Sequence, residues 1–299
     1  MSLVYTTKTH RAPYPRIDPT QPHLSAAGKT VLIVGGSTGI GRATASAFLA
    51  AGATRLVLTG RREDVLATAA AELKKSTSNA AAQILTFAAD ITDEAGMERV
   101  FAETEQAFGG NPRISWSAFE INVRGAATLA RLVVRHASSP SSSPLKTKDK
   151  EDADAEKAKA PSPTTMLIQL STAGALFPAN GALPMSAYAA SNLAAVKVME
   201  YVGAETDPSV LRVLSVHPGI FPETEGGQEM VKESGIAWEG DDINLPAHFL
   251  VWAASHEAEF LRNKLVFATW DVDELVARKE EIASTPELLI GLNGFPRSL

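Results

Sequence analysis

The chain has 299 residues, no cysteine, 45% hydrophobic residues and a formal net charge of −6 at pH 7. Its length suits one large domain or two small ones with a substantial core. The negative charge disfavours a nucleic-acid partner, and the lack of cysteine excludes disulfides, cysteine-ligated zinc and a thiol nucleophile. The N-terminus lacks the apolar core of a signal peptide, and no run of about 18 apolar residues occurs, so we expect a cytoplasmic protein without a membrane partner.

Residues 1–27 carry Pro13, Pro15, Pro19 and Pro22 and show little apolar periodicity. Proline fixes φ and removes a backbone donor, so this segment is expected to form an extended N-terminal arm or tail. The remaining residues, 28–299, are expected to form a single domain.

From Lys29 onward, short apolar runs alternate with helical patterns. The predicted strands are 31–34, 55–59, 84–88, 166–170, 211–216 and 264–268. The predicted helices are 40–51, 63–75, 94–108, 117–137, 187–204, 244–255 and 271–282. Strands separated by helices of this length indicate β-α-β crossovers, so we predict an α/β fold with a Rossmann-like, doubly wound parallel sheet.

The first apolar run ends in the turn Gly35-Gly36-Ser37-Thr38-Gly39-Ile40-Gly41, and an alanine-rich helical pattern follows. Glycines let the backbone approach a pyrophosphate, while the free N–H groups and positive end of the helix face the phosphate charge. The turn therefore predicts a nucleotide site. The alternatives are a glycine-rich turn without a ligand and the nucleophile elbow of a hydrolase, which residues 35–39 also spell. A hydrolase elbow normally follows several strands, and Gly41 has no role in one.

Residues 138–165 do not share this alternation. They are rich in Ser, Pro and Ala, and five lysines (146, 148, 150, 157, 159) balance five acids (149, 151, 152, 154, 156). With no apolar face to bury, this segment is expected to be a disordered insertion.

Several motifs resemble the coenzyme-binding motifs of one family in the family's order. Val34-Gly35-x-x-x-Gly39-Ile40-Gly41 resembles the fingerprint of short-chain dehydrogenase/reductases, with Val34 where Thr is usual. Asp90-Ile91 looks like the adenine-contacting pair, and His217-Pro218-Gly219 followed by Thr224 resembles the motif beside the nicotinamide. The resemblance implies coenzyme contacts at Gly35, Ser37, Thr38, Gly39, Ile40, Gly41, Asp90, Ile91, Pro218, Gly219 and Thr224.

The catalytic residues of that family also have matches here. Asn122 matches the helical active-site Asn, Ser171 the catalytic Ser, and Tyr188 the catalytic Tyr. By resemblance, Asn122 positions a proton-relay water, Ser171 holds the substrate oxygen and Tyr188 is the acid or base in hydride transfer between nicotinamide and a small carbonyl or alcohol. The resemblance also implies a homodimer or homotetramer. We expect no metal, and His217 is expected to be a packing residue.

Coenzyme choice follows from charge at the end of the second predicted strand. A site that prefers NAD has an acid there, whereas this chain has Arg61 and Arg62. A guanidinium binds a 2′-phosphate that an acid would repel, so NADP(H) is expected rather than NAD. Arg61 is the residue placed to make the contact, and two solvated arginines at a helix start are the alternative.

Two departures from the family pattern bear on activity. Asn192 stands where the family has a Lys that favours the phenolate of the Tyr, and an amide brings no charge. The central strand and its Asn-Asn-Ala-Gly turn are missing or shortened, since only residues 114–116 resemble a strand. We therefore expect a frayed strand and a sheet that is weak or open there. A catalytically impaired, nucleotide-binding or interaction protein, or a truncated gene product, is the alternative to an active enzyme.

The loop between Ser171 and Tyr188 is longer than usual for the family and contains Pro178 and Pro184. The substrate loop is therefore expected to be enlarged. Should Ser171 only form a strand-end turn, Thr172 is the neighbouring hydroxyl to test.

Overall fold

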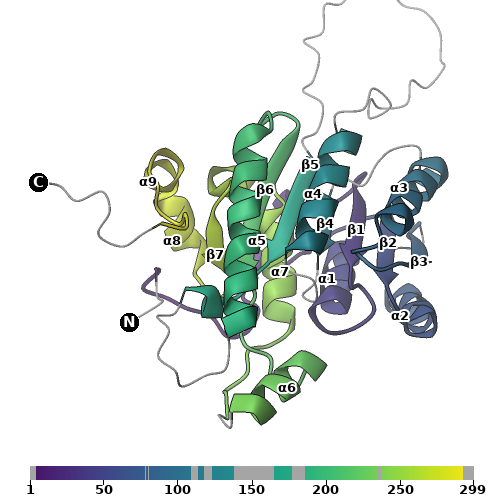
Figure 1. Cartoon of the computed structure of the whole chain (residues 1–299), viewed down its shortest axis with the longest axis horizontal. Helices are drawn as coiled ribbons and strands as arrows, with labels where there is room; N and C mark the ends of the chain where they lie inside the picture. Colours follow the sequence, from purple (N-terminus) through teal and green to yellow (C-terminus); the bar gives the residue numbers. More distant parts are fainter. Residues whose placement is uncertain are drawn as a thin grey trace, which may run out of the picture.

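The computed structural model describes residues 5–77, 79, 81–108, 114–117, 123–137, 165–176, 186–234 and 237–291. One parallel sheet of seven strands has the order β3-β2-β1-β4-β5-β6-β7 (Figure 1). Its strands are β1 (Thr30–Val34), β2 (Arg55–Gly60), β3 (Gln83–Ala88), β4 (Ile114–Ser117), β5 (Thr165–Leu170), β6 (Leu211–His217) and β7 (Leu265–Phe267). The predicted α/β fold with a doubly wound parallel sheet is confirmed. Strand order reverses between β1 and β4, where such sheets bind ligands.

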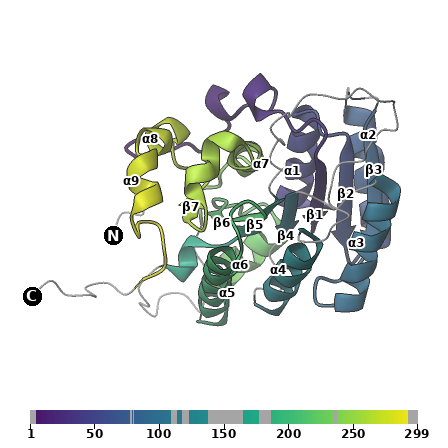
Figure 2. The ribbon, with the colours of Figure 1, turned by 90° about the horizontal axis from the view of Figure 1, so that it is seen from above.

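Helices cover both faces of the sheet (Figure 2). The described helices are α1 (Gly39–Ala50), α2 (Glu63–Ser76), α3 (Glu94–Phe108), α4 (Arg124–Ala137), α5 (Ser186–Glu205), α6 (Glu225–Ser234), α7 (Asn244–Ala253), α8 (Val272–Ala277) and α9 (Lys279–Ser284). Val31 and Ile33 belong to the core shared with α1, α2 and α7, whereas Leu32 and Val34 belong to the core shared with α3, α4 and α5. Because both faces are covered, β1 is apolar almost throughout.

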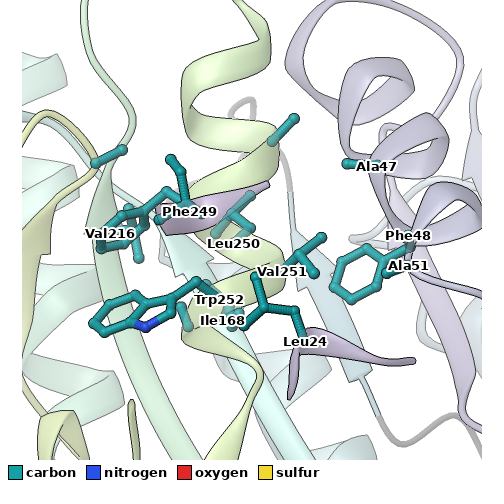
Figure 3. Close-up of a cluster of buried hydrophobic side chains, with 14 of the residues drawn as sticks. Leu24, Ala47, Phe48, Ala51, Ile168, Val216, Phe249, Leu250, Val251 and Trp252 are labelled. Atoms are coloured by element: carbon teal, nitrogen blue, oxygen red, sulfur yellow. The ribbon is translucent and has the colours of Figure 1, made fainter. Parts of the chain in front are cut away.

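The N-terminal arm contributes to the larger core. Residues 15–17 and 22–24 form single turns of 3₁₀-helix, each opened by a proline, and Ile17 and Leu24 are buried. Figure 3 shows Leu24 among the side chains of Phe48 and Trp252. Tyr5 and Tyr14 also pack against this core, so the segment expected as an extended arm or tail is held on the domain by apolar burial.

Strand β4 corrects one expectation from the sequence. Its four residues pair in parallel with β1 on one side and with β5 on the other. The strand is short, as predicted, but it is present, and the prediction of a sheet open at this position is wrong. All four residues pair with a neighbouring strand along both edges of β4, so its backbone groups have partners in spite of its length.

Three helical segments also differ from expectation. Ser117 lies in β4, and the helix predicted over 117–137 begins at Arg124. The helix predicted over 271–282 is two helices that meet at Arg278, and α6 was not predicted. Asn122 and residues 138–164 of the predicted insertion lie outside the described residues, while Thr165 opens β5. Within the described ranges, no helix is long and apolar enough to cross a bilayer.

Candidate active site

The glycine-rich turn after β1 is pressed against the end of β2. The N–H groups of Gly35 and Gly36 both donate to the carbonyl of Thr59, at 2.8 and 3.1 Å. A Cβ on Gly36 would lie 2.7 Å from Leu58 Cδ2, and Gly35 and Gly39 have φ of +80° and +53°. These are positions where glycine is required, by close approach or by left-handed backbone.

The start of α1 provides a cradle for an anion. Thr38, the N-cap residue, is extended and makes no side-chain cap, and the first turn holds no acidic residue. The first N–H groups of the helix therefore have no side-chain oxygen from the cap, and they lie at the carboxyl end of β1. The methyl group of Thr224 lies 4.0 Å from where a Cβ of Gly39 would be, so Thr224 is brought over this turn. These residues fit the diphosphate of a dinucleotide.

Charged residues gather at the ends of β2 and β3. Asp90 Oδ1 accepts hydrogen bonds from Thr92 Oγ1 at 2.6 Å and Thr92 N at 2.8 Å. These bonds, and then the charge of Arg61, lower the pKa of Asp90. Arg62 Nη2 lies 3.9 Å from Glu225 Oε2 at the start of α6, and both side chains are more than half exposed. Such an exposed pair is weak.

Two neighbouring hydroxyls, those of Ser171 and Thr172, follow the end of β5, and Thr172 contacts Tyr188. Ser171 is 1% exposed, and among the residues that the structure describes its Oγ has no hydrogen-bond partner. Thr172 Oγ1 accepts a hydrogen bond from Gly174 N at 3.1 Å and hydrogen-bonds the Tyr188 hydroxyl. Burial raises the pKa of Tyr188, and the Thr172 bond opposes that rise. An unpaired buried hydroxyl is costly, which fits a group that awaits a ligand oxygen.

Asn192 occupies the position one turn after Tyr188 in α5. Its Nδ2 donates to the Tyr188 carbonyl at 2.9 Å, and the residue is 3% exposed. The amide is thus bound to its own helix. Lys197, five residues further along α5, instead binds Glu200 at 2.5 Å and the carbonyl of Ile290 at 3.0 Å.

His217 joins the end of β6 to the end of β5. Its Nδ1 accepts a hydrogen bond from Ala173 N at 3.2 Å, and its ring lies edge-on to Phe267. Burial lowers the pKa of His217 to about 4, while a hydrogen bond to the Ser171 backbone opposes the shift. A neutral ring is required because a protonated Nδ1 cannot accept.

After His217 the chain turns through Pro218 and Gly219, whose φ is +120°. Sequence reasoning found this motif but missed Asp241, which packs against Gly219 from a loop without periodicity.

The carboxyl-terminal edge of one parallel sheet thus carries a cradle that fits a dinucleotide and, after β5, a serine hydroxyl without a hydrogen-bond partner among the described residues. The next residue, Thr172, contacts the half-buried Tyr188 of α5. These features are typical of a coenzyme-dependent oxidoreductase. Comparison with known proteins supports the same class of enzyme. The family model "short chain dehydrogenase" matches residues 29–111. A short chain dehydrogenase/reductase of Claviceps purpurea is 35% identical over 295 residues, which is 97% of this chain and 95% of the relative. The relative AacuD of Aspergillus aculeatus is 33% identical over 294 residues, 96% of each chain.

Solved structures show the same fold. L-sorbose reductase of Gluconobacter frateurii, complexed with NADPH and L-sorbose, has a TM-score of 0.63 at 20% identity, over 82% of this chain and 96% of that one. A short chain dehydrogenase of Burkholderia cenocepacia in complex with NADP has a TM-score of 0.61 at 18% identity, over 81% and 96%. The chain belongs to the short-chain dehydrogenase/reductase family and is an NAD(P)-dependent oxidoreductase.

Proposed function

We propose that this protein is an NADP(H)-dependent reductase of a small, fairly apolar carbonyl compound. The observation that carries the proposal is the hydrogen bond between Thr172 and Tyr188, next in the chain to the buried hydroxyl of Ser171, which has no partner among the residues that the structure describes. This arrangement offers a substrate oxygen one hydroxyl that holds it and another that protonates it.

The coenzyme supplies a hydride at nicotinamide C4 when bound. Gly35, Ser37, Thr38, Gly39, Ile40, Gly41 and Thr224 would hold its diphosphate, Asp90 and Ile91 its adenine, and Pro218 and Gly219 would lie beside its nicotinamide. The left-handed glycines and the uncapped start of α1 support the first of these assignments.

In the reduction, Ser171 would orient the carbonyl oxygen, and Tyr188 would donate its proton to that oxygen as the carbonyl carbon gains a hydride and the C=O π pair moves onto the oxygen. Thr172 supports the donor because its Oγ1 accepts from Gly174 N, which leaves the Thr172 proton free for the Tyr188 oxygen. Asn122 is assigned the relay water by family resemblance. Asn192, bound to the Tyr188 carbonyl, brings no cation to the phenol.

Reduction is the direction that this site favours. Burial keeps the Tyr188 phenol protonated at neutral pH, since its pKa is raised from an ordinary value near 10. A protonated phenol is ready to give a proton, whereas oxidation of an alcohol requires the phenolate.

Preference for NADP(H) is supported by Arg61 and Arg62 after β2. No acidic residue occurs between Thr59 and Arg62, and the pairing of Arg62 with Glu225 is exposed and weak. A 2′-phosphate would gain charge-assisted hydrogen bonds that a ribose hydroxyl does not make.

The proposal is tested by NADPH oxidation with a panel of small ketones and aldehydes. We expect turnover by the wild-type protein, and Tyr188→Phe should abolish turnover while NADPH still binds. If neither the wild type nor Asn192→Lys turns over any carbonyl while both bind NADPH, the reductase is excluded and a nucleotide-binding protein without catalysis remains.

A further inference from the structure

The N-terminal arm reaches the carboxyl edge of the sheet, although it precedes β1 in the chain. Thr9 forms an antiparallel bridge with Trp270, and His10 N donates to the Thr269 carbonyl at 2.7 Å. Trp270 follows β7, so residues 9–11 lie at the edge where β6 ends in His217. The arm is therefore placed beside the Pro218–Gly219 turn.

Arg11 fastens the arm to residues 239–242. Its Nε donates to Asp241 Oδ1 at 2.9 Å, and its Nη2 donates to the carbonyl of Glu239 at 2.5 Å. The Arg11 carbonyl in turn accepts from Asp242 N at 2.7 Å. Both the side chain and the backbone of Arg11 thus bind the same segment.

Asp241 transmits this contact to the turn. Its second oxygen, Oδ2, accepts from Ile220 N at 2.9 Å, and Asp241 N donates to the Ile220 carbonyl at 2.8 Å. The carboxylate side chain is only 6% exposed, and a Cβ on Gly219 would lie 2.7 Å from Oδ2. Asp241 therefore packs directly on the left-handed Gly219 and hydrogen-bonds the next residue, Ile220.

The arm and the turn also share a hollow. A cavity of about 260 Å³ is lined by His10, Arg11, Ile220, Phe267 and Trp270, among others. Its wall comes partly from the arm and partly from the ends of β6 and β7. A shift of the arm changes both the turn and this wall.

We propose that Arg11 is a positioning residue that acts through Asp241 to hold the Pro218–Gly219 turn and the Ile220 that follows it. The N-terminal arm is then part of the active site. The assignment of this turn to the nicotinamide rests on the proposed function. Without Arg11, the buried Asp241 carboxylate loses its cation and its bond to Ile220 is no longer oriented. The hydride donor and the substrate then lose their alignment while the adenine end of the coenzyme stays bound.

Arg16 offers a matched control on the same arm. It binds Glu257 and Asp273, so it fastens the arm to the domain without touching the turn. Arg11→Ala should lower kcat for NADPH oxidation by about 10- to 100-fold. Arg16→Ala should leave kcat near the wild-type value, and Arg11→Lys, which keeps the charge but loses the planar fork, should recover part of the loss.

Hydrogen–deuterium exchange of residues 218–221 gives a readout that does not depend on turnover. Arg11→Ala should speed exchange at Ile220, whereas Arg16→Ala should not. If Arg11→Ala does not fold, the exchange at Ile220 is measured on Arg11→Lys instead. Unchanged exchange in the Arg11 variant, or an equal fall in kcat for Arg11→Ala and Arg16→Ala, overturns the proposal. If the wild type turns over no carbonyl, the proposed function fails, but exchange at Ile220 still decides whether Arg11 holds the turn.

Discussion

The side-chain amide of Asn192 donates a hydrogen bond to the backbone carbonyl of Tyr188, 2.9 Å away and one helical turn earlier. In the family that this chain belongs to, a Lys at this position brings positive charge to the catalytic tyrosine. Here the amide hydrogen-bonds its own helix instead. Burial raises the pKa of Tyr188, and no charge from Asn192 opposes that rise. With its pKa raised by burial, the Tyr188 phenol stays protonated at neutral pH.

Asn192→Lys should move the pH profile of the reverse reaction. For the wild type, alcohol oxidation should keep rising above pH 10, because the pKa of Tyr188 is raised from 10.0 and the reaction needs the phenolate. A cation that lowers this pKa by roughly two units raises the phenolate fraction at neutral pH about 100-fold. Initial rates of NADP reduction across pH measure the shift.

Asn192→Met is the control, since it has the length of lysine without the charge. This variant should show the same pH profile of alcohol oxidation as the wild type. Equal profiles for Asn192→Lys and Asn192→Met would show that a cation at this position does not govern Tyr188.

Arg61→Ala should reduce the preference for NADPH over NADH. Loss of charge-assisted hydrogen bonds to a 2′-phosphate costs about 1.5–3 kcal/mol, roughly 10- to 150-fold in Kd. The NADH affinity should change little, and Arg62→Ala should have the smaller effect. Fluorescence titration of both coenzymes measures the ratio. A double variant of Arg61 and Arg62 that keeps the wild-type ratio would refute the assignment.

His217 should make folding stability depend on pH in the mildly acidic range. Its pKa falls from 6.5 to about 4 on folding, so between these values the unfolded chain binds the proton more readily. The stabilisation from the neutral ring is thus complete above pH 6.5 and is lost as pH falls toward 4, up to about 3 kcal/mol. Urea unfolding at a series of pH values measures it.

His217→Asn keeps an acceptor for Ala173 N but does not titrate. Its stability should therefore fall less than that of the wild type between pH 6.5 and 4.5. Parallel curves for the two proteins would assign the acid sensitivity to carboxylates instead.

Gly36→Ala should destabilise the turn after β1. Its Cβ would lie 2.7 Å from Leu58 Cδ2 and 3.2 Å from the Ile33 carbonyl, an overlap that costs about 1–3 kcal/mol. Gly60→Ala is the control, because its nearest neighbour would be Ser37 Oγ at an ordinary 3.6 Å. Denaturant midpoints compare the two, and equal stability of both variants would contradict the close approach of β1 and β2.

The repeating pattern of apolar runs and helices was enough to predict the sheet, because every described strand other than β4 is an apolar run long enough to recognise. Strand β4 was doubtful because Ile-Ser-Trp-Ser has no such run, and only pairing with β1 and β5 makes it a strand. Ser171 and Tyr188 were predicted from the order of the family's motifs, and in the structure Thr172, the residue after Ser171, contacts Tyr188.

Contacts between distant parts of the chain had no local signal. Arg11 and Asp241 are separated by 230 positions, and neither belongs to a periodic element. The bond of Asn192 to its own helix was equally hidden, since the sequence shows only that the charge is absent.

Calorimetric titration of the purified chain with NADPH and NADH tests the central claim most directly. We predict saturable uptake of NADPH that is tighter than uptake of NADH. Absence of binding heat with either coenzyme, for protein that unfolds cooperatively, would contradict the dinucleotide site on which the proposed reaction depends.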